Sequence, residues 1–295
     1  MALTGSPALR SRLLAAVDGA ERLPGEYRRV AVFGGIYNNR LALEAAVSEA
    51  KRREAEAILC LGDLGGFGPH PDRVFDILRR HGIKVMQGNY DVSVSGGLND
   101  CGCGYADPRD NRFARISYDY TFRNTSPGNR EWLAGLPPAF RFSLGGREVL
   151  ACHGSPRRTN EFLWESTTPD GLIRAFLDAA ETDLLLASHT GIKWQRRLDD
   201  GRGFVNVGVL GRPENDGTTR VWFTLLTGNR EGGRDSAPGP GWRAVFVPVV
   251  YDHEALALEM REEGLPGEFV ESVLTGWWTT CLEILPAKER ARGRY

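Results

Sequence analysis

AILCLGDLGGFGPHP (residues 57–71) joins an apolar strand to a loop rich in Gly and Pro, and Asp63 follows the strand directly. Upstream, YRRVAV is another extended segment, and FGGIYNN (33–39) follows it as a tight loop. Residues 40–57 then carry small and apolar side chains at the spacing of one helix face. Strand, tight loop and helix in this order are typical of open α/β enzymes, whose chemistry lies beyond the carboxyl ends of strands.

The rest of the chain alternates strands with helices early and has consecutive strands late. Further strands are predicted at 83–88, 139–144, 147–154, 182–189, 202–210, 219–227 and 242–250. Helices are predicted at 72–80, 129–137, 169–180, 253–264 and 267–276, with a long loop at 91–111 and a linker-like segment at 228–241. This mixed order indicates one α/β domain, residues 28–275, built from two packed sheets flanked by helices. A helical extension (1–27) precedes it and a tail (276–295) follows it.

Composition restricts the class of protein without naming a function. The 295 residues are 41% hydrophobic and 25% charged, with a net charge of −1, so no nucleic-acid or anionic-membrane partner is indicated. No apolar run approaches the roughly 18 residues of a membrane span, and the N-terminus has no signal-peptide core. Five cysteines, an odd number, suit reduced thiols and predict a cytoplasmic protein.

Four polar residues each follow a predicted strand. Asp63 follows LCLG, Asn89 follows VMQG, His153 follows VLAC and His189 follows LLLAS. Taken singly, each has an ordinary explanation as a turn or surface residue. Taken together, two imidazoles, a carboxylate and an amide oxygen at one edge of the fold make a reasonable site for Zn²⁺, Mn²⁺ or Fe²⁺. We call these four residues the ligand quartet.

Five motifs in succession, LGDLGGFGPHP, GNYD, CHGSP, SHTG and FVNVGVLGRPENDG, resemble those of the calcineurin-like metallophosphoesterases, especially the compact bacterial phosphodiesterase branch. The similarity extends over residues 28–275. It implies a four-layer αββα sandwich of two mixed sheets, and hydrolysis of a phosphate mono- or diester.

The chain also departs from the family pattern. The family's first strand ends in Asp-x-His, and the aligned segment here has Gly35 and Tyr37 at those positions. Gly191 occupies the last ligand position of the same metal site, and Tyr90 stands at the catalytic His. The ligand quartet, which resembles the family's second metal site, is complete. Because the losses fall on one site, the resemblance implies a mononuclear centre with one divalent Mn, Zn or Fe ion and puts a second metal in doubt.

Two interpretations remain for the substituted tyrosines. Tyr90 could donate a hydrogen bond or a proton to a leaving oxygen, and Tyr37 could ligate a ferric ion. An unperturbed Tyr, with a pKa near 10, is however a weak acid at neutral pH. Alternatively, both rings fill the volume left by a lost metal, which is the interpretation we favour. Cys101 and Cys103, in the loop after Asn89, are either additional metal ligands or incidental thiols of a lid.

Two function classes follow from these residues. In the first, a metal-activated water attacks phosphorus in a small phosphorylated substrate, Asp91 orients a neighbouring group, and Arg157 and Arg158 bind phosphate oxygens. The two arginines could equally be solvated surface residues. In the second, the chain is a non-catalytic ligand-binding or scaffold protein of the same fold. The complete quartet favours the enzyme, and a homo-oligomer is compatible with either class.

Overall fold

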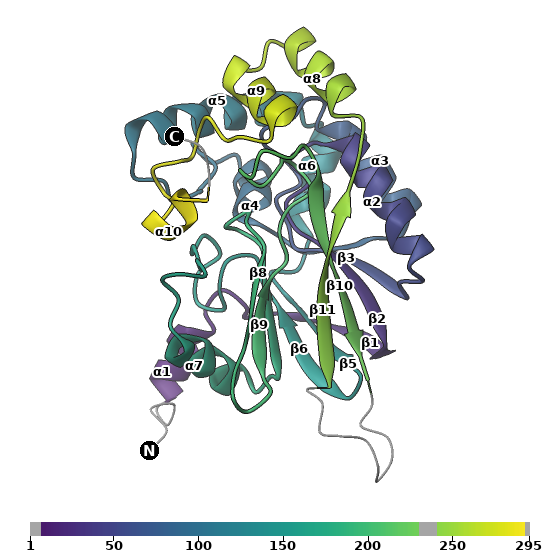
Figure 1. Cartoon of the computed structure of the whole chain (residues 1–295), viewed down its shortest axis with the longest axis vertical. Coiled ribbons are helices and arrows are strands. Elements are labelled where there is room, and N and C mark those ends of the chain that lie inside the picture. Colours follow the sequence, from purple (N-terminus) through teal and green to yellow (C-terminus); the bar gives the residue numbers. More distant parts are fainter. Residues whose placement is uncertain (1–6, 230–240, 293–295) are drawn as a thin grey trace.

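The computed structural model describes residues 7–229 and 241–292, which form two β-sheets lying face to face with helices on both outer sides (Figure 1). One sheet has five strands in the order β11-β10-β2-β3-β4. β2, β3 and β4 are parallel, whereas β10 is antiparallel to both β2 and β11. The strands are β2 (Arg29–Phe33), β3 (Ala57–Cys60), β4 (Lys84–Val85), β10 (Val221–Gly228) and β11 (Trp242–Val249).

The second sheet has six strands in the order β1-β5-β6-β7-β9-β8. β6, β7 and β9 are parallel, and β5 and β6 form an antiparallel hairpin that turns at Gly145 and Gly146. The strands are β1 (Glu21–Tyr27), β5 (Phe140–Leu144), β6 (Arg147–Ala151), β7 (Leu184–Ala187), β8 (Trp194–Arg197) and β9 (Gly203–Asn206).

Alternating side chains of the strands build separate parts of the core. Val30 and Val32 of β2 face the second sheet, whereas Ala31 and Phe33 face the helices on the other side. Both faces are buried, which explains why this strand reads as a nearly continuous apolar run rather than an alternating one. The apolar space between the sheets is filled by aliphatic and aromatic side chains, including Leu59, Phe142, Leu186 and Val205.

Helices cover the outer face of each sheet and complete four layers. The apolar face predicted for residues 40–57 is buried in α2 against the five-stranded sheet. α2 (Arg40–Arg52), α3 (Asp72–Arg80), α8 (His253–Glu262) and α9 (Gly267–Thr275) lie on this side. α1 (Pro7–Leu13) and α7 (Asp170–Ala180) cover the six-stranded sheet. The predicted four-layer αββα sandwich is therefore confirmed.

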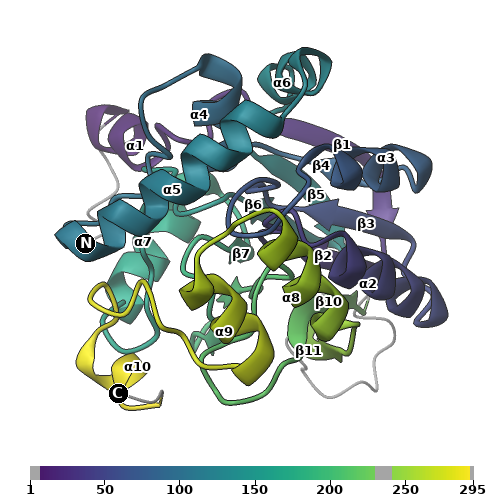
Figure 2. The ribbon, with the colours of Figure 1, turned by 90° about the horizontal axis from the view of Figure 1, so that it is seen from above.

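Three further helices and a short C-terminal one surround the edge at which the parallel strands end. They are α4 (Asn89–Gly96), α5 (Pro108–Asn124), α6 (Pro127–Ala134) and α10 (Ala287–Arg290). Seen from above, α5 and α9 lie over this edge (Figure 2). Among residues 7–229 and 241–292, no helix combines the length and the apolar character that crossing a bilayer requires.

The structure differs from the sequence expectations at three places. Residues 21–27 are not part of a helical extension, because β1 pairs in parallel with β5 and completes the second sheet. The predicted loop 91–111 is helical at both ends, where α4 and α5 enclose a shorter connection. The predicted tail 276–295 packs onto the fold through buried Trp278 and Leu285. Most of the linker-like segment 228–241 lies outside the described residues.

Candidate metal centre

Three side chains of the ligand quartet meet at the carboxyl ends of strands from both sheets. Asp63 follows β3, His153 follows β6 and His189 follows β7. Their ligating atoms all lie within 4.8 Å of one another, and the three side chains are buried. The two sheets point their parallel strands toward the same edge, so residues distant in sequence converge there.

His153 is held in a defined orientation. Its Nδ1 lies 2.6 Å from the carbonyl oxygen of Leu61, which can only accept a hydrogen bond, so Nδ1 carries a proton. Its Nε2 lies 3.1 Å from Asp63 Oδ2 and 3.2 Å from His189 Nδ1. Burial lowers the pKa of His153, but the adjacent Asp63 carboxylate outweighs burial and raises it. The same pair lowers the pKa of Asp63 despite its burial.

His189 is oriented in the complementary way. Its Nε2 lies 3.2 Å from the carbonyl oxygen of Cys103, so Nε2 donates to that oxygen and Nδ1 faces His153. Burial, reinforced by the charge of His153, lowers the pKa of His189 to about 3. A second hydrogen bond that fixes the free nitrogen of each imidazole is the usual arrangement around metal-binding histidines.

Asn89, the fourth member of the quartet, has a buried side-chain oxygen that accepts no hydrogen bond from the described residues. Its Nδ2 donates to the carbonyl oxygen of Cys101 at 2.8 Å, which fixes the orientation of the amide. Within the described part of the chain, no donor reaches Asn89 Oδ1, although that atom is buried. An orphaned buried acceptor is costly, and a metal ion would satisfy it. The donor set of two imidazole nitrogens, a carboxylate and this amide oxygen therefore fits a divalent transition metal.

Asp91 supports the loop that presents Asp63. Its carboxylate accepts hydrogen bonds from the backbone N–H groups of Asp63 (2.7 Å), Leu64 (3.0 Å) and Gly88 (2.8 Å). Asp63 has φ +57°, in the left-handed region that is unfavourable for a residue with a β-carbon, and these bonds hold it there. Burial and the nearby Asp63 carboxylate raise the pKa of Asp91, while the three N–H donors oppose the rise. Asp91 is thus a positioning residue.

The two substituted tyrosines pack against the site. The Tyr37 ring is wedged between two glycines: a β-carbon on Gly35 would lie 2.4 Å from Tyr37 Cε1, and one on Gly211 would lie 2.2 Å from Tyr37 Cδ2. Tyr90 donates its hydroxyl proton to Ser117 Oγ at 2.9 Å. Burial raises the pKa of each tyrosine. Both side chains therefore stay protonated at neutral pH and occupy volume beside Asp63.

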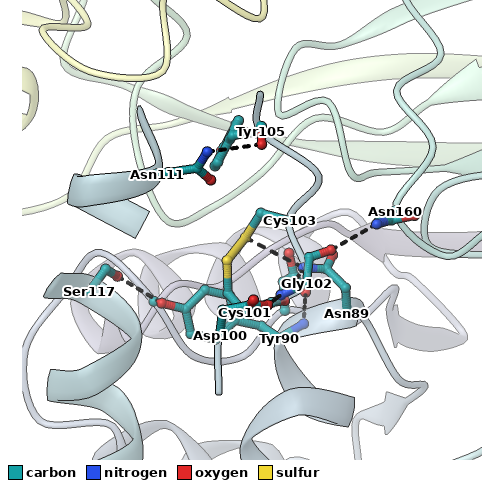
Figure 3. Close-up of a disulfide and its surroundings, with 12 residues drawn as sticks. Asn89, Tyr90, Asp100, Cys101, Gly102, Cys103, Tyr105, Asn111, Ser117 and Asn160 are labelled. Carbon is teal, nitrogen blue, oxygen red and sulfur yellow. Dashed lines mark hydrogen bonds between the residues drawn. A yellow bond between two sulfur atoms is a disulfide. The ribbon is translucent and has the colours of Figure 1, made fainter. Parts of the chain in front are cut away.

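A disulfide joins Cys101 and Cys103, so the expectation of five reduced thiols does not hold for this pair (Figure 3). Gly102 between them has φ +62°, which lets the short turn bring the two sulfurs together. As a disulfide, neither sulfur offers the thiolate that metal ligation needs. The backbone of this turn acts instead, because the Cys101 and Cys103 carbonyl oxygens orient Asn89 and His189.

A small cavity opens beside the quartet. Its volume is about 70 Å³, and Asp63 and His189 line one side of it, with Tyr37, Phe113 of α5 and Phe269 of α9 among the aromatic walls. Arg212, which the sequence analysis did not single out, also lines it. The signal was present as a cation within the Gly/Pro loop GRPEN (211–215), but its burial could not be read from sequence.

The arginines expected at the phosphate lie elsewhere. Neither Arg157 nor Arg158 lines the cavity. The Arg157 guanidinium pairs with Glu161 and lies over the Phe176 ring, while Arg158 is exposed. A phosphate role for these two residues remains a prediction that the geometry does not favour, because a cation already engaged by a carboxylate is less available to an anion.

Comparison with known proteins places this geometry in a family. Residues 29–228 match the calcineurin-like phosphoesterase superfamily domain. The uncharacterised protein MJ0912 of Methanocaldococcus jannaschii is 24% identical over 213 residues, which cover 67% of this chain and 82% of that protein. A metallophosphoesterase from Sphaerobacter thermophilus is 24% identical, with a TM-score of 0.63 over 85% of this chain and 100% of that chain. The hypothetical protein PH1004 from Pyrococcus horikoshii is 22% identical, with a TM-score of 0.68 over 85% and 99%. These two structures share the fold.

Proposed function

The chain belongs to the calcineurin-like phosphoesterase superfamily, and on that premise we propose that it hydrolyses a phosphate ester with one divalent metal ion held by the ligand quartet. The proposed substrate is a small phosphorylated molecule whose phosphoryl group enters the cavity beside Asp63 and His189.

The unsatisfied oxygen of Asn89 carries this proposal. It is buried and lacks a partner among the described residues, whereas its amide nitrogen is anchored to the turn at Cys101. In the cluster of Asp63, His153 and His189, each imidazole has one nitrogen hydrogen-bonded to a backbone carbonyl oxygen and the other directed toward the cluster. A bound metal ion would satisfy this acceptor, which supports metal binding at this point.

The residues divide the work in a simple way. A divalent ion bound by the quartet would act as a Lewis acid on a phosphoryl oxygen and would lower the pKa of water. Asp91 holds the Asp63 loop, and the 101–103 turn holds Asn89 and His189, so the ligands are fixed before substrate binds. The aromatic walls of the cavity exclude bulk water and strengthen these charge interactions.

Metal analysis combined with hydrolysis tests the proposal. The protein is stripped with a chelator, reloaded with Mn²⁺, Zn²⁺ or Fe²⁺, and assayed on p-nitrophenyl phosphate and bis-p-nitrophenyl phosphate. We expect about one ion per chain and metal-dependent turnover, both lost in His153→Ala. His81→Ala is the matched control, since His81 lies at the end of α3 and pairs with Lys51 away from the site. Turnover that survives in Asp63→Asn would reveal a contaminating enzyme. No bound metal after reloading would favour the non-catalytic alternative.

A further inference from the structure

Arg212 is a buried cation that forms no ion pair with any described carboxylate. Only 8% of its surface is exposed, and its side chain lines the same cavity as Asp63 and His189. Across residues 7–229 and 241–292, no carboxylate forms an ion pair with Arg212 and no acceptor takes a hydrogen bond from it; its Nε is buried without a partner. By contrast, the partly buried Arg40, Arg157 and Arg196 each pair with a carboxylate. Because burying an unpaired charge is strongly unfavourable, this arrangement calls for an anion.

The guanidinium is also held in place. Its central carbon lies 3.6 Å from the centre of the Trp278 ring, a stacked cation–π geometry. Trp278 in turn is fastened to the loop that carries Arg212: its Nε1 donates to the Pro213 carbonyl oxygen at 2.7 Å, and its N–H donates to Asn215 Oδ1 at 2.8 Å. The cation is therefore preorganised: Trp278 packs against it, and its Nε has no acceptor among the described residues.

Cavity size and charge indicate which anion fits. A volume of about 70 Å³ holds a few water molecules or one tetrahedral anion, far less than the ~300–1,000 Å³ of sites that enclose drug-sized ligands. A bound divalent ion, the negative Asp63 carboxylate and the positive Arg212 guanidinium together give the cavity a net charge of about +2. That charge matches the dianion of a phosphate monoester better than the monoanion of a diester.

We propose that Arg212 binds the phosphoryl oxygens of a phosphate monoester in the cavity that it lines together with Asp63 and His189, and that the organic part of the substrate stays outside. The assignment rests on the proposed function for its substrate class, but the anion site itself does not. Tyr37 fills the space between Gly35 and Gly211. The positive charge of Arg212 is therefore part of the protein itself and does not depend on an ion bound in that space.

Phosphate binding without turnover tests the proposal. The affinity for inorganic phosphate is measured by calorimetry on metal-loaded and on chelator-treated protein, for the wild type, Arg212→Met and Arg212→Lys. Arg197→Met is the matched control, because Arg197 also stacks on a tryptophan, Trp242, but is exposed and donates to a carbonyl oxygen outside the cavity. Dimethyl phosphate serves as the diester probe.

We expect phosphate to bind roughly 10- to 100-fold more weakly in R212M, the range for loss of charge-assisted hydrogen bonds, with R212K intermediate and R197M unchanged. Metal-free R212M should also unfold at a higher temperature than the wild type, because it no longer buries an unpaired charge. Phosphate affinity in R212M within twofold of the wild type would overturn the anion site, whatever the stability. If R212M does not fold, R212K decides by the same criterion.

The two probes separate the substrate class from the site. Equal affinities for dimethyl phosphate and inorganic phosphate would overturn the monoester assignment. Arg212-dependent phosphate binding in a protein that hydrolyses no ester would leave the anion site standing and remove the proposed function. If hydrolysis depends on the metal but phosphate binding does not depend on Arg212, the proposed function would stand and the anion site would be overturned.

Discussion

His153 Nε2 and Asp63 Oδ2 lie 3.1 Å apart with both side chains buried, a distance at which a protonated imidazole donates a hydrogen bond to the carboxylate. The raised pKa of His153 means that this proton must leave when a metal binds. His189, with a pKa near 3, and Asp63, with a lowered pKa, have no proton to lose at neutral pH.

Metal affinity should therefore rise about tenfold per pH unit below the raised pKa of His153 and level off above it. Lowering the pH protonates His153, and because this proton competes with the metal ion, metal affinity falls as the pH falls. Titration calorimetry in buffers of different ionisation enthalpy should show close to one proton released per ion. A pH-independent affinity between pH 6 and 8 would contradict this assignment.

Asn89→Ala should weaken metal binding roughly 10- to 100-fold, because it removes an oxygen that no protein group satisfies. The cost to the metal-free protein should be small, about 1 kcal/mol, since the amide nitrogen loses its hydrogen bond to the Cys101 carbonyl oxygen and a weak one to Cys103 Sγ. Metal competition with a chromogenic chelator measures the first quantity and urea unfolding the second. Unchanged metal affinity would remove Asn89 from the ligand set.

Gly35→Asp should destabilise the protein by about 3 kcal/mol or more, because the new β-carbon would lie 2.4 Å from the Tyr37 ring and a carboxylate would be buried. Adding Tyr37→His should recover part of this loss, since the smaller ring vacates the contact. Urea unfolding of both single variants and the double variant gives the coupling energy. Additive effects would show that Tyr37 does not occupy the space beside Gly35.

Adding Gly191→His to that pair restores the three ligands that the family resemblance implies for the first metal site. Gly191 has φ +73°, so a residue with a β-carbon is strained there by about 1 kcal/mol. We expect the triple variant to bind a second ion when the strain is tolerated, as measured by elemental analysis. The Gly35→Asp, Tyr37→His double variant is its control, and one ion per chain in both would mean that the backbone has diverged as well.

Reduction of the Cys101–Cys103 disulfide should weaken metal binding by up to roughly tenfold, because the turn holds Asn89 and His189 through its carbonyl oxygens. Metal affinity is compared with and without a phosphine reductant. The Cys101→Ser, Cys103→Ser double variant should resemble the reduced protein and respond no further to the reductant. Identical affinities in the oxidised and reduced wild type would show that the turn keeps its shape without the bond.

The ends of strands were the part of this protein that local patterns could identify. Short apolar runs followed by Gly-Asp, Gly-Asn or a His mark where β3, β4, β6 and β7 end, and parallel strands bring such residues to one edge. The ligand quartet and the two-sheet architecture could therefore be named before any coordinates. Residues 21–27 were not predicted as a strand because a Pro and a Gly interrupt the strand pattern. Only their pairing with β5 makes them a strand.

Contacts between distant segments decided the features that local patterns could not show, namely the burial of Arg212 and the imidazole tautomers. Arg212 is buried because Trp278, some 66 residues later, stacks on it, and it is unpaired because no carboxylate among the described residues comes within ion-pair distance of it. The imidazole tautomers likewise depend on carbonyl oxygens of Leu61 and Cys103, which belong to other segments. Periodicity records which face of one element is apolar, whereas the partner of a buried polar atom is fixed by packing among elements. For that reason the candidate metal ligands could be named from the chain's own residues, whereas the proposed anion site beside them depends on the assembled fold.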